Sequence, residues 1–396
     1  MRSPVLSRRQ VLRAAATSAA TATAIAATPR AAASATGHSL VVVMLRGGLD
    51  GLHAIVPTDT GHYRDNGLRT AGPRGGLIGL GDGFGLHPAL RPLAEFYRSG
   101  DLAPVVAVGS PLDSRSHFDQ QAALDLGLPG RLDHPTGWLG RHLSVVRGTG
   151  VLRGFSNGSR LATSLRGAPR STALDALERF EIPFVDEESP VEDAFLAAAG
   201  DGPFGAAAND ALAISKLVTG RNTPLAEPSV AYPETTWGGQ FADAARLLRS
   251  SIGVEIAVLD LAGWDTHVLQ GGSNGRLADR LADLAGSLAA FLHDVRDLGD
   301  RVTVVVASEF GRRVRENGGG GTDHGRGGVA FVAGRGIRGG RVHGDWPGIG
   351  AGDLVDGDVR VTTDIRDVFG EVLAQRVGTD LGHVFPEHSH KPVGLL

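Results

Sequence analysis

The sequence of 396 residues contains no cysteine. Disulfide bonds and thiolate metal ligands are therefore excluded, and any metal ion must be held by carboxylates, imidazoles, amides or hydroxyl oxygens. Such ligands favour hard or borderline divalent ions, so zinc, manganese, calcium and magnesium all stay open. Lysine is nearly absent as well, since Lys216 and Lys391 are the only two. Almost every positive charge is thus an arginine, whose planar guanidinium suits bidentate binding of oxyanions.

The chain also lacks an apolar run long enough for a stable membrane span, which takes about 20 strongly apolar residues. The segment from Ala14 to Ala27 is short and only mildly apolar, because it consists mostly of Ala and Thr. Paired arginines at 8 and 9 precede it, and small residues at 31–33 follow it, as in an export signal with its cleavage site. We predict that residues 1–33 are a twin-arginine signal peptide rather than a disordered Ala/Thr-rich tail.

This signal predicts the twin-arginine translocase as a partner and a periplasmic, secreted or cell-surface destination. Residues 1–33 hold five arginines and no acid, so the formal charge of −4 becomes −9 once they are removed. A mature protein this acidic has too little basic surface to neutralise phosphates, and we expect no general nucleic-acid binding.

Short, unbroken apolar runs rich in β-branched residues recur along the mature chain. They lie at residues 39–45, 103–108, 254–261, 302–307 and, more weakly, 329–333. Runs of this kind predict strands buried on both faces of a parallel sheet. Apolar residues at helical spacing alternate with them, at residues 88–98, 117–126, 241–248, 277–295 and 365–377. This alternation predicts an α/β fold with a doubly wound, mostly parallel sheet flanked by helices.

We assign residues 38–396 to one such domain. The stretch from about 150 to 236 fits the alternation less well, because it holds Gly-, Ser- and acid-rich pieces and a proline-punctuated loop. We interpret it as an inserted cap region rather than an independent domain.

Polar residues follow the predicted strands at the points where ligands bind in open α/β sheets. The acidic and histidine side chains at these points are Asp50, Asp265, His267, Glu309, Asp323 and His324. Because the carboxyl ends of parallel strands meet at one edge, we expect these groups to converge and bind a divalent metal ion. Each has a structural alternative: Asp50 as a turn or helix cap, Asp265 and His267 in an Asx-type turn, and Glu309 in a salt bridge with Arg312 or Arg313.

Ser116 stands before a predicted helix, where a serine is by default an N-cap. The positive potential at a helix N-terminus also favours an oxyanion, so Ser116 is the candidate nucleophile, with Arg115 and His117 beside it in the candidate catalytic set. The arginines at 46, 115 and 312 suit phosphate, sulfate or carboxylate recognition, although each alone can be a surface or salt-bridging residue.

These segments together resemble a known family. The motifs are Arg46-Gly-Gly-Leu-Asp-Gly-Leu52, Leu86-His-Pro-Ala-Leu90, Arg115-Ser-His-Phe118, Gly263-Trp-Asp-Thr-His267, and Ser308-Glu-Phe-Gly-Arg312 with Thr322-Asp-His-Gly325. They resemble domain of unknown function 1501, whose members typically begin with a twin-arginine signal. That family is in turn distantly similar to the alkaline phosphatase and sulfatase superfamily, which holds one or two divalent metals at the carboxyl edge of its sheet.

The superfamily resemblance implies ligands in a fixed chain order, and Asp50, Ser116, Asp265 with His267, and Asp323-His324 follow it. Phe310 stands where the superfamily has the histidine of its Asp-His-Gly unit, and that unit comes a dozen residues later here. A late histidine ligand has no clear counterpart, with His343, His383, His388 and His390 as weak candidates.

The sequence favours an exported, metal-dependent hydrolase that acts on phosphate or sulfate esters. The alternative on the same fold is a catalytically inactive protein that binds an anionic glycan or a partner protein. A weaker third option is a purely structural exported protein, in which the acids and histidines only stabilise loops.

Overall fold

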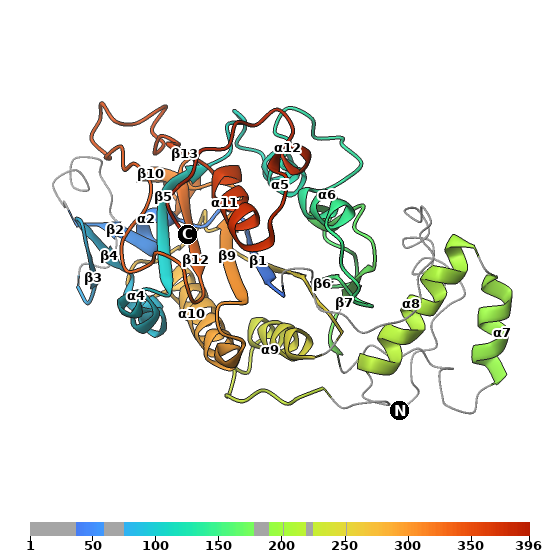
Figure 1. Ribbon diagram of the computed structural model, residues 1–396. Helices are drawn as coiled ribbons and strands as arrows, with labels where there is room; N and C mark the ends of the chain where they lie inside the picture. Colours follow the sequence, from blue (N-terminus) through green and yellow to red (C-terminus); the bar gives the residue numbers. More distant parts are fainter. Residues whose placement is uncertain (1–36, 59–74, 178–189, 201, 219–224, 251) are drawn as a thin grey trace.

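The computed structural model describes residues 37–58, 75–177, 190–200, 202–218, 225–250 and 252–396. The predicted signal peptide, residues 1–33, lies outside this range. The central element is an eight-stranded sheet with the order β13-β5-β12-β9-β1-β8-β6-β7 (Figure 1). Its strands are β1 (Ser39–Arg46), β5 (Leu102–Gly109), β6 (Gly154–Asn157), β7 (Ser171–Leu174), β8 (Ile256–Ala262), β9 (Val302–Ser308), β12 (Gly328–Ala333) and β13 (Thr363–Asp364). All five predicted strands belong to this sheet, and the prediction of an α/β fold with a mostly parallel sheet is confirmed.

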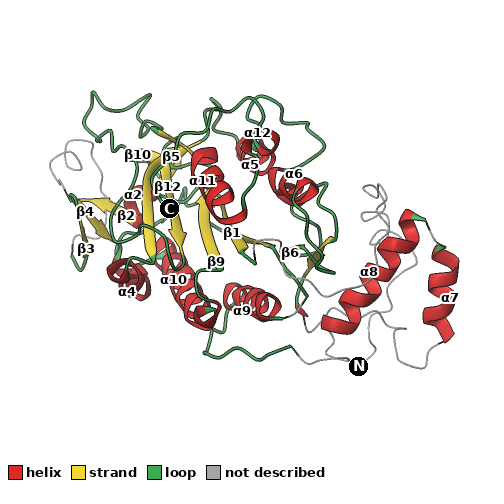
Figure 2. Cartoon of the chain, in the orientation of Figure 1, coloured by secondary structure: helices red, strands yellow, loops and turns green. Residues whose placement is uncertain are grey.

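Alternate residues of β1 explain why its sequence is apolar throughout. Val41, Val43 and Leu45 belong to the core on one face, with α4 (Ala94–Ser99), α9 (Thr236–Arg249) and α10 (Arg276–Asp294). The side chains between them, such as Val42 and Met44, belong to the core on the other face, with α5 (His117–Leu126), α6 (Trp138–Val145), α11 (Ile365–Val377) and α12 (Leu381–Val384). Figure 2 shows the resulting three layers, with the yellow sheet between two groups of red helices. A strand buried on both faces has no polar side, and its sequence therefore lacks the usual alternation of polar and apolar residues.

Only β12 runs against the others among the described strands of the main sheet, because it pairs antiparallel with both β5 and β9. It starts opposite Val108, near the carboxyl end of β5. The segment that enters β12 therefore lies at the same edge of the sheet where the parallel strands end. This segment includes Asp323 and His324.

The remaining elements are short. The three-stranded sheet β2 (Ile55–Pro57), β4 (Phe84–Leu86) and β3 (Ile78–Gly81) follows the small helix α2 (Gly51–Ala54). The 3-10 helices are η1 (Pro88–Leu93), η2 (Thr163–Leu165) and η4 (Arg296–Leu298), and the hairpin is β10 (Arg312–Glu316) with β11 (Thr322–His324). Among the described residues, no helix combines the length and the apolar character needed to cross a membrane.

The predicted insertion, residues 150–236, contains two kinds of structure. Its first part supplies β6 and β7, which extend the main sheet beyond β8 through parallel pairing. Its second part supplies α7 (Pro190–Ala199) and α8 (Pro203–Val218), which lie beyond this edge of the sheet in Figure 1. The role of these two helices as a cap stays a prediction.

Two buried histidines make the free energy of unfolding depend on pH. Burial lowers the pKa of His38 and of His142 to about 4, and both side chains lie almost entirely away from solvent. The unfolded chain binds these protons near pH 6.5, so stability is full above pH 6.5 and falls progressively down to pH 4. Each histidine contributes a loss of about 3 kcal/mol at most, at about 1.4 kcal/mol per pKa unit.

The variant His142→Gln isolates this effect, because an amide can both donate and accept and so keep the hydrogen bond with the Thr379 hydroxyl, which lies 2.8 Å from His142 Nδ1. We expect the variant to lose about 2–3 kcal/mol less stability than the parent between pH 6.5 and pH 4. Urea unfolding at several pH values measures this difference. Parallel curves for the two proteins would show that His142 does not titrate on unfolding.

Candidate metal centre

Four of the predicted site residues lie close together where β1, β8 and β9 end. His117 comes from the first residue of α5, Asp265 and His267 from the loop after β8, and His324 from β11. The hairpin β10–β11 brings His324 to this place, because it folds back so that His324 pairs with Arg312, just after β9. Arg312 and His324 are thus twelve residues apart in sequence but direct neighbours in space.

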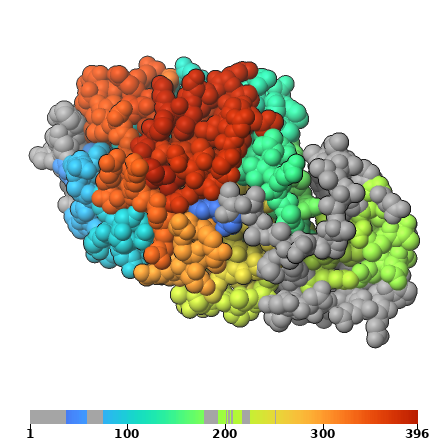
Figure 3. Space-filling view, viewed as in Figure 1, coloured from blue at the N-terminus to red at the C-terminus, as the bar shows by residue number. Residues whose placement is uncertain are grey.

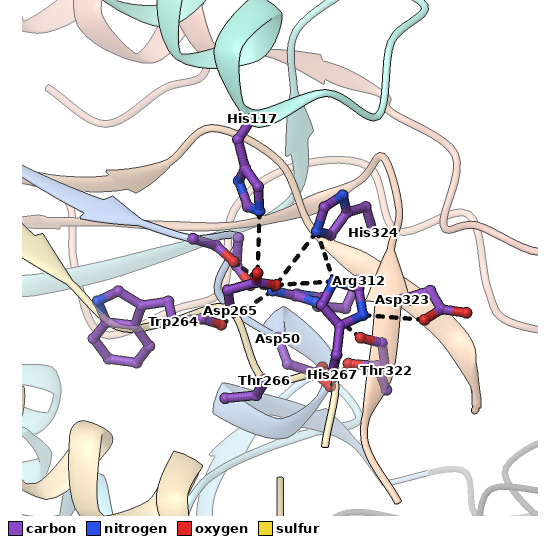
Figure 4. Close-up of polar contacts among 12 residues, drawn as sticks. Asp50, His117, Trp264, Asp265, Thr266, His267, Arg312, Thr322, Asp323 and His324 are labelled. Atoms are coloured by element: carbon purple, nitrogen blue, oxygen red, sulfur yellow. Dashed lines mark hydrogen bonds and ion pairs between the residues drawn. The ribbon is translucent and has the colours of Figure 1, made fainter. Parts of the chain in front are cut away.

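Three imidazoles and one carboxylate point at a common centre (Figure 4). Oδ1 of Asp265 lies 3.0 Å from Nε2 of His267 and 3.3 Å from Nε2 of His324. Its Oδ2 lies 3.5 Å from Nε2 of His117, and the ligand atoms of His117, Asp265 and His324 all lie within 4.8 Å of one another. The Nε2 atoms of His267 and His324 are only 2.9 Å apart. Three ligand atoms, one each from His117, Asp265 and His324, are therefore close enough to share one ion, and Nε2 of His267 lies beside two of them.

Each of the three imidazoles is held from behind through its Nδ1 atom. Nδ1 of His117 lies 2.8 Å from Glu309 Oε1, and Nδ1 of His267 lies 3.1 Å from Asp323 Oδ1. Nδ1 of His324 lies 2.8 Å from the backbone oxygen of Arg115. These partners can only accept, so Nδ1 carries the proton in each neutral imidazole and Nε2 presents a lone pair to the centre. Metal-binding histidines are oriented by such outer partners.

This arrangement fits a divalent cation. Two imidazole lone pairs at 2.9 Å repel each other unless a proton or a cation lies between them. Nε2 of His117 is buried and makes no hydrogen bond within the described structure. Two imidazole nitrogens and a carboxylate oxygen, with Nε2 of His267 beside them, are ligands that zinc accepts, and they also suit other borderline ions. Burial lowers the pKa of His324, which favours the neutral form that a metal requires.

Glu309 lies behind the imidazole of His117 and orients it. Its Oε1 accepts hydrogen bonds from His117, from the backbone N–H of Gly47 at 2.8 Å and from Gln121 at 3.0 Å. Burial alone would raise the pKa of Glu309, but these donors lower it to about 2. Glu309 therefore stays ionised and orients His117. The salt bridge to Arg312 or Arg313, offered as an alternative from sequence, is replaced by this pair with His117.

Asp50 lies in a separate buried network. Its Oδ2 is 2.9 Å from Nδ1 of His53 and accepts a hydrogen bond of 2.7 Å from Gln270. Its Oδ1 accepts from the backbone N–H of His53 and so caps α2. Asp50 is not among the described groups whose ligand atoms lie close enough to share one ion. The structure thus gives Asp50 the contacts of a helix cap within a polar network, below the centre in Figure 4.

Arg312 connects the loops that carry the ligands. Its side chain is fully buried and donates to the backbone oxygens of Gly47 and Gly48, at 2.5 and 2.8 Å. It also donates to the backbone oxygens of Thr322 and Trp264 and, at 2.5 Å, to Oδ1 of Asp265. One guanidinium therefore fixes the loops after β1 and β8 and the strand β11 relative to each other.

The predicted catalytic set is only partly at the centre. His117 is one of the four converging side chains, whereas Ser116 caps α5 by accepting from the backbone N–H of Asp119 at 3.4 Å. The Arg115 guanidinium donates to the buried carboxylate of Asp358 at 2.6 and 3.1 Å. Arg115 contributes its backbone oxygen to the centre, through His324.

Two further residues of the site were not given a role from the sequence. Asn317 donates to Asp323 Oδ1 at 2.9 Å and to the backbone oxygen of His267 at 3.0 Å, and so fixes the outer partner of His267. It lies in a glycine-rich loop, where an asparagine suggests only a turn. Phe310 is the second residue: its ring lies 4.9 Å from that of His117 and 4.8 Å from that of His324. Phe310 thus packs against two of the clustered imidazoles.

These observations define an α/β protein with a histidine- and carboxylate-lined centre at the carboxyl edge of its sheet. The model of one protein family, described as protein of unknown function (DUF1501), matches residues 110–396. The chain belongs to this family. No match was found in a comparison with curated proteins.

Solved structures with a similar fold include a phosphonate monoester hydrolase of Agrobacterium radiobacter, with 12% identity and a TM-score of 0.36, covering 89% of this chain and 78% of that one. The C-terminal periplasmic domain of EcEptC from Escherichia coli has 11% identity and a TM-score of 0.38, covering 92% of each chain. The PsFucS1 sulfatase from Pseudoalteromonas sp. has 12% identity and a TM-score of 0.37, covering 90% and 70%. The similarity concerns the fold.

Proposed function

We propose that this chain is a metal-dependent hydrolase of phosphate or sulfate esters that acts outside the cytoplasm after export. The observation that carries the proposal is the cluster of His117, Asp265 and His324, with His267 beside it and with Nδ1 of each imidazole held by an acceptor. Ligands oriented in this way are typical of metal centres. The side chains of Asp265, His267 and Asp323 are 45%, 37% and 51% exposed, so that a small substrate can reach the centre.

The residues around the centre comprise candidate metal ligands and residues that position those ligands. His117, Asp265, His267 and His324 would hold the ion, which would polarise an ester oxygen and favour deprotonation of an attacking nucleophile. Glu309, Asp323 and the backbone oxygen of Arg115 keep the imidazoles in the required tautomer. Arg312 holds the carboxylate of Asp265 in place from the buried side.

A second candidate function, metal-dependent binding without turnover, is favoured by one observation. Among the described residues, no hydroxyl group forms a hydrogen bond with the side chains of the four converging residues, and the Ser116 hydroxyl caps α5. A hydrolase with this geometry would therefore use water as the nucleophile, whereas a binding protein would need no nucleophile.

The experiment that separates these functions uses the mature protein, its metal content and a panel of aryl phosphate and sulfate esters. We expect bound metal and turnover that chelators abolish and added metal restores. If water is the nucleophile, Ser116→Ala should keep turnover within a few-fold of the parent. The variant should lose about 1 kcal/mol of stability in either case, because it lacks the helix cap. A Ser116 nucleophile would instead lose turnover by orders of magnitude. Metal without turnover supports the binding protein, and absence of both overturns the two proposals.

A further inference from the structure

The last residues of the chain lie along α11 and are fixed to it by two buried carboxylates. Figure 3 shows the C-terminal residues, in red, as a continuous patch on one face. Glu371 accepts hydrogen bonds from four successive backbone N–H groups, those of residues 393–396, at 2.6 to 3.0 Å. Asp367, one helical turn earlier, accepts from the backbone N–H of Lys391 at 2.8 Å. The tail is therefore held in a defined position by its backbone.

This position brings two histidines of the tail to Asp367. Nε2 of His388 lies 2.8 Å from Asp367 Oδ1, and Nδ1 of His390 lies 3.4 Å from the same oxygen. The two imidazoles are separated by one residue, which places side chains on the same side of an extended segment. The ligand atoms of Asp367, His388 and His390 all lie within 4.8 Å of one another. None of these residues belongs to the metal centre described above.

Two further observations point to a ligand for this group. Nδ1 of His390 is buried and makes no hydrogen bond in the described structure, although it lies 3.4 Å from Asp367 Oδ1, so it is available as a ligand. Gly370 lies in the interior of α11, where glycine costs about 1 kcal/mol relative to alanine. A Cβ atom at Gly370 would lie 2.8 Å from His390 Nδ1. The glycine thus makes room for the imidazole against the helix.

We propose that Asp367, His388 and His390 form a second site for a borderline divalent cation such as Zn²⁺, which fastens the C-terminal tail to α11. Two imidazole nitrogens and a carboxylate oxygen are ligands that zinc accepts, with a fourth position left for water. The side chains are only 7%, 11% and 18% exposed, so the ion would be partly shielded. This site does not depend on the proposed hydrolase function.

The test counts bound zinc per chain and measures protection of the tail. The parent protein is expected to bind two equivalents, and His388→Ala/His390→Ala one. His117→Ala/His324→Ala should retain the tail equivalent. His383→Ala is the matched control, because this exposed histidine of the same segment lies outside the cluster, and it should still bind two. Zinc at a hundred times its dissociation constant should suppress carboxypeptidase digestion of the tail about 100-fold.

Gly370→Ala gives an independent check that keeps every ligand. The added methyl group should displace His390 and weaken zinc binding at the tail while improving the intrinsic helix propensity of α11. A tail that binds no zinc in the variant lacking His117 and His324, and whose digestion zinc does not slow in the parent, would overturn the proposal. If only the centre around Asp265 fails to bind metal, zinc binding at the tail is still expected, so the two proposals can fail separately.

Discussion

Replacing Arg312 by methionine is expected to lower the free energy of unfolding by about 3–5 kcal/mol, measured on metal-free protein in the presence of a chelator. The side chain is fully buried and donates to four backbone oxygens and to Asp265. Methionine fills a similar volume but leaves these oxygens without a donor, and each buried acceptor left unpaired costs about 1–3 kcal/mol. Some of this cost will be recovered where water can enter.

Arg301→Met is the matched control, because Arg301 is exposed and its side chain donates to the single backbone oxygen of Leu298. A surface substitution of this kind should change stability by no more than about 0.5 kcal/mol. Urea unfolding of both variants measures the contrast. If Arg312→Met were as mild as the control, the guanidinium would not be what holds the loops together.

Metal affinity is expected to fall by different amounts in His267→Ala, which removes a candidate ligand, and in Asp323→Asn, which changes the residue that orients it. His267→Ala removes an Nε2 atom that lies 3.0 Å from Asp265 Oδ1 and 2.9 Å from Nε2 of His324, and we expect metal binding at the centre to be lost at micromolar metal. Asp323→Asn keeps every candidate ligand but replaces the carboxylate behind His267 Nδ1 with an amide. Loss of such an outer partner typically weakens metal binding about 10–100-fold. Turnover, where present, should follow metal occupancy in both variants.

The measurement is metal titration by calorimetry, with unfolding curves to show that the variants are folded. His293→Ala is the control, because this half-exposed histidine contacts Glu95 and lies outside both clusters. Excess metal should restore Asp323→Asn but not His267→Ala. Equal affinities for the parent and His267→Ala would place the ion elsewhere.

Most of the fold could be predicted because its strands are apolar on both faces and its helices have one apolar side. The helices at residues 117–126 and 365–377 were predicted with the bounds that α5 and α11 have. The strands β6 and β7 were not predicted, since their four-residue segments include glycine, serine and asparagine. Such short edge segments carry too little apolar pattern to be distinguished from loops.

The site was predicted as a set of residues but not as an arrangement. The ends of the predicted strands indicate which loops meet, and on this basis Asp265, His267 and His324 were predicted as site residues. They do not show which carboxylate faces the centre and which lies behind an imidazole. Asp323 and Glu309 lie behind imidazoles, and this follows from the β10–β11 hairpin and from the first turn of α5, which are three-dimensional facts.

The position of β1 has a consequence for the way the chain folds. β1 is made first, yet both of its neighbours, β8 and β9, come more than two hundred residues later. Until those segments have been synthesised, a fully apolar strand has two unpaired edges, which is a surface that promotes aggregation. Pairing across such long sequence separations is also slow, because loop closure must precede the stabilising contacts. We therefore expect the nascent chain to depend on chaperones until residue 308 has left the ribosome, and the metal centre to form only after that.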